Sequence, residues 1–515
     1  QIWGSNGVHN NQDCSSSQDL PHSRALMSCQ SACDRVDSNG SAVAEEDIEL
    51  LVKHVQAYHG DTVLVSAAEG KGRILLAACE FEPGQRILLE YPLVQVAVNR
   101  SEAAYAELIR MQEEGALEFA PFFYWAALCS LTDKEIACAR CQAWPSVPSQ
   151  TQAQALRLHA PEESCQVPSA PVLSIVERMW EPEAGPDPLR LERLLQVWIH
   201  NSFDQGSADD ALEAGAMYLA ASMMSHSCNA NAAWHLDEAD SFMLHARGWI
   251  EQGDEITIPY LGPFDLCLPT CDRRAILSAT KGFLCRCERC AAPLDAARSF
   301  TCPRSGGAAY ASTDGASLVS EACGVLSEEE AAPLLGAEAS LRPWARGRPE
   351  FHHDAGTSDT PEAAAPAPAA DLLQRALAAG LARTHWIVDA ARTAAAAEAG
   401  AGEESRGLLR EACSALRASG PHTATRRARL QVALGRDLCT ARSGAELAEA
   451  EEVLAAAAEA LALLFGDDHP EHQEAAALRD RAQRLRSSTA AAPRRALADA
   501  ARSAGGAGWA RRGAR

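Results

Sequence analysis

The sequence predicts an α+β protein with a β-rich N-terminal half, a helical insertion within that half, and a C-terminal α-helical domain. Short apolar runs separated by glycine- and proline-containing turns fill residues 62–98 and 217–261, a pattern typical of strands. Alanine-rich segments with helical periodicity fill residues 371–486. Three closely spaced cysteines at 285–290 lie between these parts and suggest a metal site that closes the β-rich half.

The size and charge of the chain limit what it can be. Its 515 residues are too many for one hydrophobic core and predict about three domains. The net charge of −23 argues against direct binding of nucleic acid and is compatible with a basic peptide partner, although solubility alone accounts for most of these acidic residues. No run of 18 or more strongly apolar residues occurs, so we expect no membrane contact. We expect the protein in the cytoplasm, the nucleus or both; the missing signal peptide carries no weight, because the chain begins at Gln1.

The first domain is expected over residues 45–292, after a segment at 1–44 that is rich in Ser, Asn, Gln and Gly and is expected to be disordered. Cys14, Cys29 and Cys33 in that segment lack a clear set of partners. A helix is expected at 45–58, and strands follow at 62–67, 73–79 and 85–98, with turns at 69–72 and 82–85. Residues 101–200 form a mostly helical insertion, which a Pro/Ser/Gln-rich loop interrupts near 145–172.

The second half of the chain changes character twice. Short strands return within 217–261, and residues 293–370 are expected to be loop, ending in a Pro/Ala linker near 355–370. Helices are expected over 371–486, with breaks at Gly400, 419–422 and 466–470; their pairing suggests a repeat array, although no clean 34-residue period is present. The Ala/Gly/Arg tail at 487–515 is expected to be disordered.

Cys285, Cys287 and Cys290 form a C-x-C-x-x-C cluster. Zinc takes four tetrahedral ligands, and Cys228 is the natural fourth. An isolated cysteine is usually a small buried hydrophobe, but three thiols at this spacing in a large chain favour a reduced metal site over disulfides. Arg286 and Arg289, between the ligands, are expected to lower the thiol pKa values.

The segment Ser-His-Ser-Cys at 225–228 has three interpretations: a nucleophile with its base, a metal corner, or a polar turn. No third orienting residue is evident, which disfavours cysteine-based hydrolysis. A second group, Cys129, Cys138 and Cys141, could bind zinc together with Cys165, but buried thiols are the favoured interpretation, because no histidine completes a familiar spacing.

Several motifs in this order resemble the SET and MYND family of protein-lysine methyltransferases. They are EGKGRILLAACEFEPGQRILLEYPLV at 69–94, IHNSFD at 199–204, SHSCNANA at 225–232, GDEITIPYL at 253–261, CDRRAILSATKGFLCRCERC at 271–290, and LFGDDHP at 464–470. The resemblance implies a β-rich SET domain with a knot-like C-terminal segment, a post-SET zinc site at 282–292, and a tetratricopeptide-like helical domain at 371–486.

The sequence departs from this family in several places. No MYND finger pattern is evident in 101–200. Ser225 stands where the family has a cofactor-holding asparagine, and Ala230 stands where it has proline. The segments CPRS at 302–305 and EACG at 321–324 each keep one cysteine where some relatives have two.

The resemblance implies transfer of a methyl group from S-adenosylmethionine to the side-chain amine of lysine in a histone or non-histone protein. Tyr260 is then the catalytic residue, which lines the lysine channel; a packed strand aromatic is the alternative. The implied cofactor-binding residues are Gly70, Lys71, Gly72, Arg73, Asn201, Ser225, His226, Tyr260 and Phe283. From the residues alone, the glycines could be a hairpin turn, Asn201 a helix C-cap, and Phe283 a core side chain.

The implied partners are a protein substrate with an accessible lysine and peptides that bind the helical domain. The alternative function is a SET-derived scaffold that no longer catalyses, which Ser225 and the unrecognised MYND finger favour. Tyr260, Asn201 and the glycine turn favour the enzyme.

Overall fold

The structure is a computed structural model and describes residues 42–98, 101–140, 144–204, 214–346, 368–441 and 443–506. It begins with α2 (Ala42–His59), which packs on the hairpin β1 (Val63–Ala68) and β2 (Gly72–Ala77). The prediction of disorder at 1–44 is wrong for residues 42–44, where α2 has begun, and its remainder, like residues 507–515, lies outside the described residues. No helix in the described part of the chain is both long enough and apolar enough to span a membrane.

Short antiparallel strands build the rest of the β-rich half. Two three-stranded sheets each join a strand from before the insertion to strands from after it, so their pairing depends on contacts between residues far apart in sequence. One sheet has the order β3 (Arg86–Glu90), β9 (Phe242–Ala246), β8 (Ala232–Leu236). Another has the order β4 (Val94–Ala97), β6 (Ala214–Met217), β5 (Phe203–Asp204).

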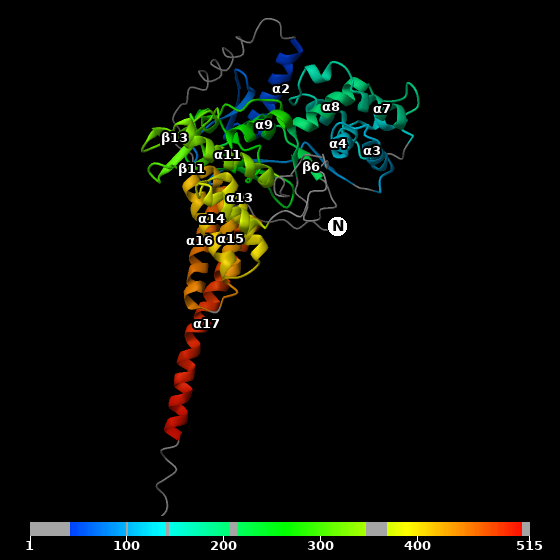
Figure 1. Cartoon of the computed structure of the whole chain (residues 1–515). Coiled ribbons are helices and arrows are strands. Elements are labelled where there is room, and N and C mark those ends of the chain that lie inside the picture. The colour runs from blue at the N-terminus through cyan, green and yellow to red at the C-terminus, as the bar shows by residue number, and fades with distance from the viewer. Residues whose placement is uncertain are drawn as a thin grey trace, which may run out of the picture.

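The helical insertion forms a lobe beside these sheets (Figure 1). Its helices are α3 (Ala103–Glu113), α4 (Pro121–Cys129), α5 (Asp133–Ile136), α6 (Ser149–Ala155), α7 (Ala170–Met179) and α8 (Pro188–Asn201). In α8, Pro188 occupies the first turn and the Asp187 carboxylate accepts the Leu189 amide, which defines where the helix starts. The loop expected near 145–172 contains α6 and the short 3₁₀ turn η1 (Glu163–Cys165).

The prediction of loop over 293–370 is wrong for its first part. Residues 294–325 form the antiparallel sheet β11 (Leu294–Thr301), β12 (Ala308–Ser312), β13 (Leu318–Ser320) and β14 (Gly324–Val325), and α11 (Glu328–Arg346) follows. The buried positions of β11 include Asp295, Ala297 and Ser299, which are polar or small and give no apolar alternation. The linker expected at 355–370 lies largely outside the described residues.

The C-terminal helices pack consecutively, each on the next. They are α12 (Ala369–Ala378), α13 (Trp386–Ala399), α14 (Glu403–Ser419), α15 (Ala424–Leu438), α16 (Gly444–Phe465) and α17 (Pro470–Gly506). The predicted breaks are confirmed, because Gly400, Gly420 and Gly466 end helices with φ angles of 66°, 116° and 87°. That these helices are tetratricopeptide-like stays a prediction.

The prediction of disorder from residue 487 is wrong as far as Gly506, because α17 continues to that residue. Alanine and arginine dominate this stretch, and both have high intrinsic helix propensity. In Figure 1, α17 projects from the helical domain beyond the other helices.

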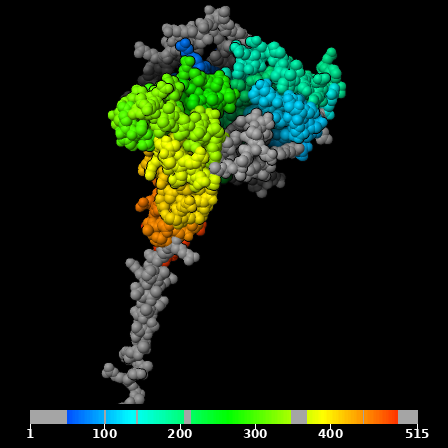
Figure 2. All heavy atoms as spheres, viewed as in Figure 1, coloured from blue at the N-terminus to red at the C-terminus, as the bar shows by residue number. Residues whose placement is uncertain are grey.

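Helix α16 docks the helical domain onto strands β8 and β9. Ala233 of β8 belongs to the same apolar cluster as Leu461 and Phe465 of α16. Beside this cluster the ring of His235 stacks on that of His245, and the ring of His469 meets His235 edge-on. Figure 2 shows the helical domain as a column extending from below the β-rich part.

Candidate functional site

The segment 225–231 is held against 255–260 by backbone pairing. Strand β7 (Ser225–His226) runs parallel to β10 (Thr257–Ile258). Asn231 fixes the end of this pairing, because its amide oxygen accepts the Thr257 amide at 2.8 Å and its amide nitrogen donates to the Glu255 carbonyl at 2.9 Å. Asn231 belongs to the SHSCNANA motif, which resembles the SET and MYND family, but sequence reasoning assigned it no separate role.

Tyr260 lies at the end of this pairing with an aromatic neighbour on each side. Its backbone amide donates to His226 Nδ1 at 2.9 Å, and its hydroxyl donates to the Met224 carbonyl. The ring centroid of Tyr260 is 5.3 Å from that of His226 and 6.2 Å from that of Phe283. Tyr260, His226 and Phe283 therefore form one aromatic cluster, whose Tyr260 remains 38% exposed.

Burial sets the protonation of this cluster. Although Tyr260 is 38% exposed as a whole, desolvation of its hydroxyl, with a smaller effect of the Glu255 carboxylate, raises the pKa of Tyr260 to about 12, so the hydroxyl stays protonated. Burial also lowers the pKa of His226 to about 4, so the imidazole is neutral near pH 7. The hydroxyl of Tyr260 acts as a hydrogen-bond donor, and His226 Nδ1 acts as an acceptor.

The glycine turn at 70–72 joins β1 and β2. Gly70 and Gly72 both have φ angles of 71°, a region that side chains rarely adopt, and nothing lies within 4 Å of where their Cβ atoms would stand. The backbone of the turn is thus open to approach from one side. Sequence reasoning offered both a hairpin turn and a cofactor loop, and the observed geometry is that of a hairpin with an accessible backbone.

Glu255 links this turn to strand β7. One carboxylate oxygen accepts Lys71 Nζ at 2.6 Å, and the other accepts Ser225 Oγ at 2.6 Å. Two residues expected to hold a cofactor therefore meet on one acidic side chain that was not among the expected site residues. Only the GDE turn at 253–255 could have signalled it.

Arg73 and Asn201 bind the chain itself. Arg73 Nη1 donates to the Arg157 carbonyl at 2.9 Å. Asn201 ends α8, and its amide nitrogen donates to the carbonyls of His159 and Val197, each at 2.7 Å. Both side chains thus converge on the backbone at 157–159, which places this part of the insertion beside the glycine turn.

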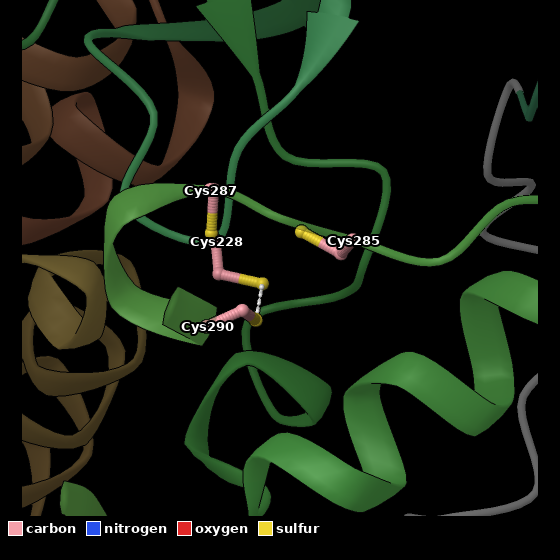
Figure 3. A group of neighbouring side chains, drawn as sticks. All are labelled: Cys228, Cys285, Cys287 and Cys290. Carbon is pink, nitrogen blue, oxygen red and sulfur yellow. Dashed lines mark hydrogen bonds between the residues drawn. The ribbon is translucent and has the colours of Figure 1, made fainter. Parts of the chain in front are cut away.

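The four cysteine sulfurs expected to bind metal come together in the structure. They all lie within 4.8 Å of one another, and Cys228 Sγ is 3.6 Å from Cys290 Sγ. Figure 3 shows the four side chains pointing toward a common centre. A tetrahedral zinc–thiolate site with Zn–S bonds of about 2.3 Å has its sulfurs about 3.8 Å apart, so this donor set fits zinc.

A buried arginine faces this cluster. Arg273, in α9 (Thr270–Lys281), is 0% exposed, and it donates to Cys228 Sγ at 3.3 Å and to Cys290 Sγ at 3.4 Å. A guanidinium in this position favours the thiolate form of both sulfurs. The sequence assigned this effect to Arg286 and Arg289. Arg289 donates to the Leu266 carbonyl at 2.5 Å and interacts electrostatically with Cys228, whereas Arg273, which contacts two of the sulfurs, was missed.

The interpretation of the weaker cysteine group as buried thiols is confirmed for Cys129 and wrong for Cys138, which is exposed. Cys129 is buried and its thiol pKa is raised by burial, Cys138 is exposed, and Cys165 receives a long contact of 3.9 Å from Arg193. Cys141 lies outside the described residues. Within the described part of the chain, one group of three or more side chains is placed to bind a metal ion, and it is the group that contains Cys228.

Comparison with known proteins identifies the segment that holds Tyr260, His226 and Cys228. Residues 72–261 match the family model of the SET domain. A SET domain-containing protein of Drosophila melanogaster, SmydA-8, is 33% identical over 105 residues, which cover 20% of this chain and 23% of that protein. A SET and MYND domain-containing protein of Dictyostelium discoideum is 36% identical over 74 residues, which cover 14% and 21%.

A third relative is named as a histone-lysine methyltransferase. Histone-lysine N-methyltransferase SET5 of Saccharomyces cerevisiae is 36% identical over 77 residues, 15% of this chain and 14% of that protein. In each of these relatives the match spans less than a quarter of its length.

Solved structures with similarity to this chain include the SET domain of LSMT bound to lysine and AdoHcy. It is 14% identical with a TM-score of 0.28, and the match covers 86% of this chain and 92% of that one. Rubisco LSMT bound to AdoMet is 13% identical with a TM-score of 0.25, and covers 85% and 93%.

Proposed function

Because residues 72–261 form a SET domain, we propose that this chain transfers a methyl group from S-adenosylmethionine to the side-chain amine of lysine in a protein substrate. The observation that carries the proposal is the convergence on Tyr260 of the two segments that pair at β7 and β10. The name of the yeast relative, a histone-lysine N-methyltransferase, supports the same reaction class.

The residues around the glycine turn fit S-adenosylmethionine. The open backbone at Gly70 and Gly72 suits the amino-acid end of the cofactor, with Lys71, Arg73, Asn201 and Ser225 at its edges. The aromatic cluster of Tyr260, His226 and Phe283 suits the flat adenine face. When bound, the cofactor supplies an electrophilic methyl on a sulfonium.

Tyr260 would orient the lysine amine. Its hydroxyl is fixed by the Met224 carbonyl, and its pKa of about 12 keeps the proton on it at neutral pH. A free lysine has a pKa of about 10.4, so the channel must favour the neutral amine, and burial in apolar surroundings does so. The chain therefore contributes orientation and exclusion of water, which suits a reaction whose electrophile is already activated.

The four-cysteine cluster would hold a structural zinc ion. With four thiolates bound, the ion has no open position, so its role is to fix the chain between Cys228 and Cys290. Phe283 lies two residues before Cys285, and Ser225 lies three residues before Cys228. The ion would thus hold both cofactor-facing segments in register.

The proposed partner is a protein with an accessible lysine, histone or non-histone, in the cytoplasm or the nucleus. The acidic charge of the chain favours substrates with basic sequence around the lysine. The helical domain would offer a second surface for peptides. We propose no direct binding of nucleic acid and no membrane association.

A second candidate is a SET-derived scaffold without catalysis. Ser225, which replaces the larger asparagine of the resembling family, is engaged by Glu255, and both hydrogens of the Asn201 amide point to main-chain carbonyls. If these contacts persist with cofactor present, the amino-acid end of the cofactor loses two partners.

Methyl transfer can be tested with labelled S-adenosylmethionine and a mixture of lysine-containing proteins. We expect labelled lysine with the native chain and a loss of about 100-fold with Tyr260→Phe, the scale of a misoriented reacting group. Tyr58→Phe, at an exposed tyrosine of α2, is the matched control and should retain the native rate. Equal labelling by Tyr260→Phe and the native chain contradicts the proposed role of Tyr260, and no labelling by either favours the scaffold.

A further inference from the structure

A buried carboxylate that is not among the proposed cofactor contacts hydrogen-bonds to the segment that precedes Ser225 and His226. Glu90, the last residue of β3, is 5% exposed and pairs across the sheet with Phe242 of β9. One of its oxygens accepts the Ala220 amide at 2.8 Å, and the other accepts the Ala221 amide at 2.9 Å. These amides open the 3₁₀ turn η2 (Ala221–Met223), whose first N–H groups have no partner within the turn. Glu90 therefore caps η2 from 130 positions away in sequence.

The capped turn leads directly into the site. Met223 and Met224 donate their amides to the carbonyls of Ala220 and Ala221, which fixes the direction of the Met224 carbonyl. That carbonyl accepts the hydroxyl of Tyr260. The order of contacts is thus Glu90, the turn η2, Met224 and Tyr260, with Ser225 and His226 following in the chain.

The charge of Glu90 is poorly compensated. Among the described residues no cation pairs with it; the titratable group that faces it is Tyr218, whose hydroxyl donates to the Asp240 carbonyl at 2.6 Å, with Asp237 also acting on Tyr218. Burial raises the pKa of Glu90 to about 7, against the opposing effect of its backbone hydrogen bonds. A protonated carboxyl carries an O–H donor on one oxygen, which makes that oxygen a weaker acceptor, so the ionised form holds the two amides more strongly in the observed geometry.

We infer that Glu90 is a positioning residue: its ionised carboxylate orders the turn at 219–224 and so places the Met224 carbonyl, Ser225 and His226 for the cofactor and for Tyr260. The part of this inference that concerns the cofactor rests on the proposed function. Because the ordered turn favours the ionised form, cofactor binding should release a proton where Glu90 is otherwise protonated.

Order in the turn and global stability should depend on pH with opposite signs. The pKa of Glu90 is raised above its ordinary value near 4.5, so its contribution to global stability is present below pH 4.5 and is lost as the pH rises through about 7. Order in the turn changes in the opposite direction, because the ionised carboxylate accepts both amides more strongly than the protonated carboxyl does. A local measurement and a global one should therefore move in opposite senses with pH.

The first test is hydrogen exchange of the native chain without cofactor, corrected for the intrinsic effect of pH on exchange. Between about pH 8 and about pH 6, either side of the Glu90 pKa, protection of the Ala220 and Ala221 amides should fall about tenfold, the scale of one lost buried hydrogen bond. In Glu90→Gln that protection should be low at both pH values. Glu80→Gln, at an exposed glutamate just before β3, should behave as the native chain.

The second test is calorimetric titration with S-adenosylmethionine in two buffers of different ionisation enthalpy. Near pH 6, we expect the native chain to release a proton on binding that Glu90→Gln does not release, and the affinity of Glu90→Gln to be about tenfold weaker at about pH 8. The titratable amine of the cofactor is common to both proteins and cancels in the comparison.

The two tests fail in distinguishable ways. Exchange that depends on pH and on Glu90, without any cofactor binding, supports the positioning role and removes the proposed function. Cofactor binding with exchange that is unchanged by pH and by Glu90→Gln overturns the positioning role and leaves the proposed function standing. If Glu90→Gln does not fold, the pH dependence of exchange at Ala220 and Ala221 in the native chain alone decides whether Glu90 has the positioning role.

Discussion

Two neighbouring regions of the chain carry cysteines, and they are held together by different means. In residues 282–291 three cysteine sulfurs converge with that of Cys228, and the apolar cluster around the four adds little beyond Leu261, Leu266 and Leu277. In residues 294–346 Cys302 and Cys323 lie instead in a larger apolar core that includes Phe300, Leu318 and Leu341. A short segment with few apolar side chains needs an ion to close it, whereas a sheet covered by helices does not.

In the second region, a buried salt bridge joins the sheet to the helix that covers it. Arg298 of β11 donates from two nitrogens to the Glu338 carboxylate of α11, at 2.9 Å and 2.6 Å. Trp386 Nε1 of α13 reaches the same carboxylate at 3.3 Å, so the pair joins this sheet to the helical domain. The buried guanidinium that faces the first region, that of Arg273 in α9, instead contacts thiols, and its partner charges would be thiolates.

The largest effect should come from breaking the four-sulfur cluster. Cys285→Ser, or removal of metal by a chelator, should release the ion and unfold the segment from Leu261 to Ala291, because structural zinc stabilises small domains on a scale of about 10 kcal/mol. Metal analysis and thermal unfolding of the same samples measure this. Cys138→Ser, at an exposed cysteine outside the cluster, should keep metal and melting temperature. If the Cys285→Ser protein kept its native metal content, the ion would not be bound by this cluster, and the first region would not be held together by metal.

An intermediate effect is expected in the region held by packing. Phe300 is 0% exposed, so Phe300→Ala should lower the free energy of unfolding by about 3–5 kcal/mol through lost burial and the cavity that remains. Metal content should stay native, since the cysteine cluster is separate from this core. Denaturant unfolding gives the first quantity. Val325→Ala, at a valine 64% exposed in the same sheet, should change it by less than about 0.5 kcal/mol.

The smallest effect should come from the cysteines of that second region. Cys302 is buried among apolar side chains, and its removal in Cys302→Ala deletes one sulfur atom, for a cost of about 1 kcal/mol. Metal per chain should not change. A drop in metal content on this substitution would show that the second region also binds an ion, and the contrast between the two regions would then disappear.

The sequence predicted what depends on local pattern. The strands at 62–98, the helix breaks at Gly400, Gly420 and Gly466, and the SET domain itself follow from periodicity, glycine conformation and motif order. The strand β11 was missed because its buried positions include Asp295 and Ser299, and the Asp295 carboxylate is used to accept the Thr270 amide at 2.7 Å.

The sequence also failed to predict the residues that support the site, because their partners lie far away in the sequence. Arg273, Glu255 and Glu90 each act on residues that lie 17 to 184 positions away. Nothing in the sequence around Arg273 and Glu90 distinguishes them from solvated charges, and only the GDE turn at 253–255 marks Glu255. Their partners are fixed by tertiary contact alone, so only the folded chain identifies them.

Calorimetric titration of the native chain with S-adenosylmethionine, with zinc assayed on the same sample, tests the central claim most directly. The account predicts one zinc ion and one bound cofactor per chain, and loss of cofactor binding once a chelator has removed the ion. A sample with its full zinc content that binds no cofactor would contradict the account and leave a scaffold as the function of this SET domain.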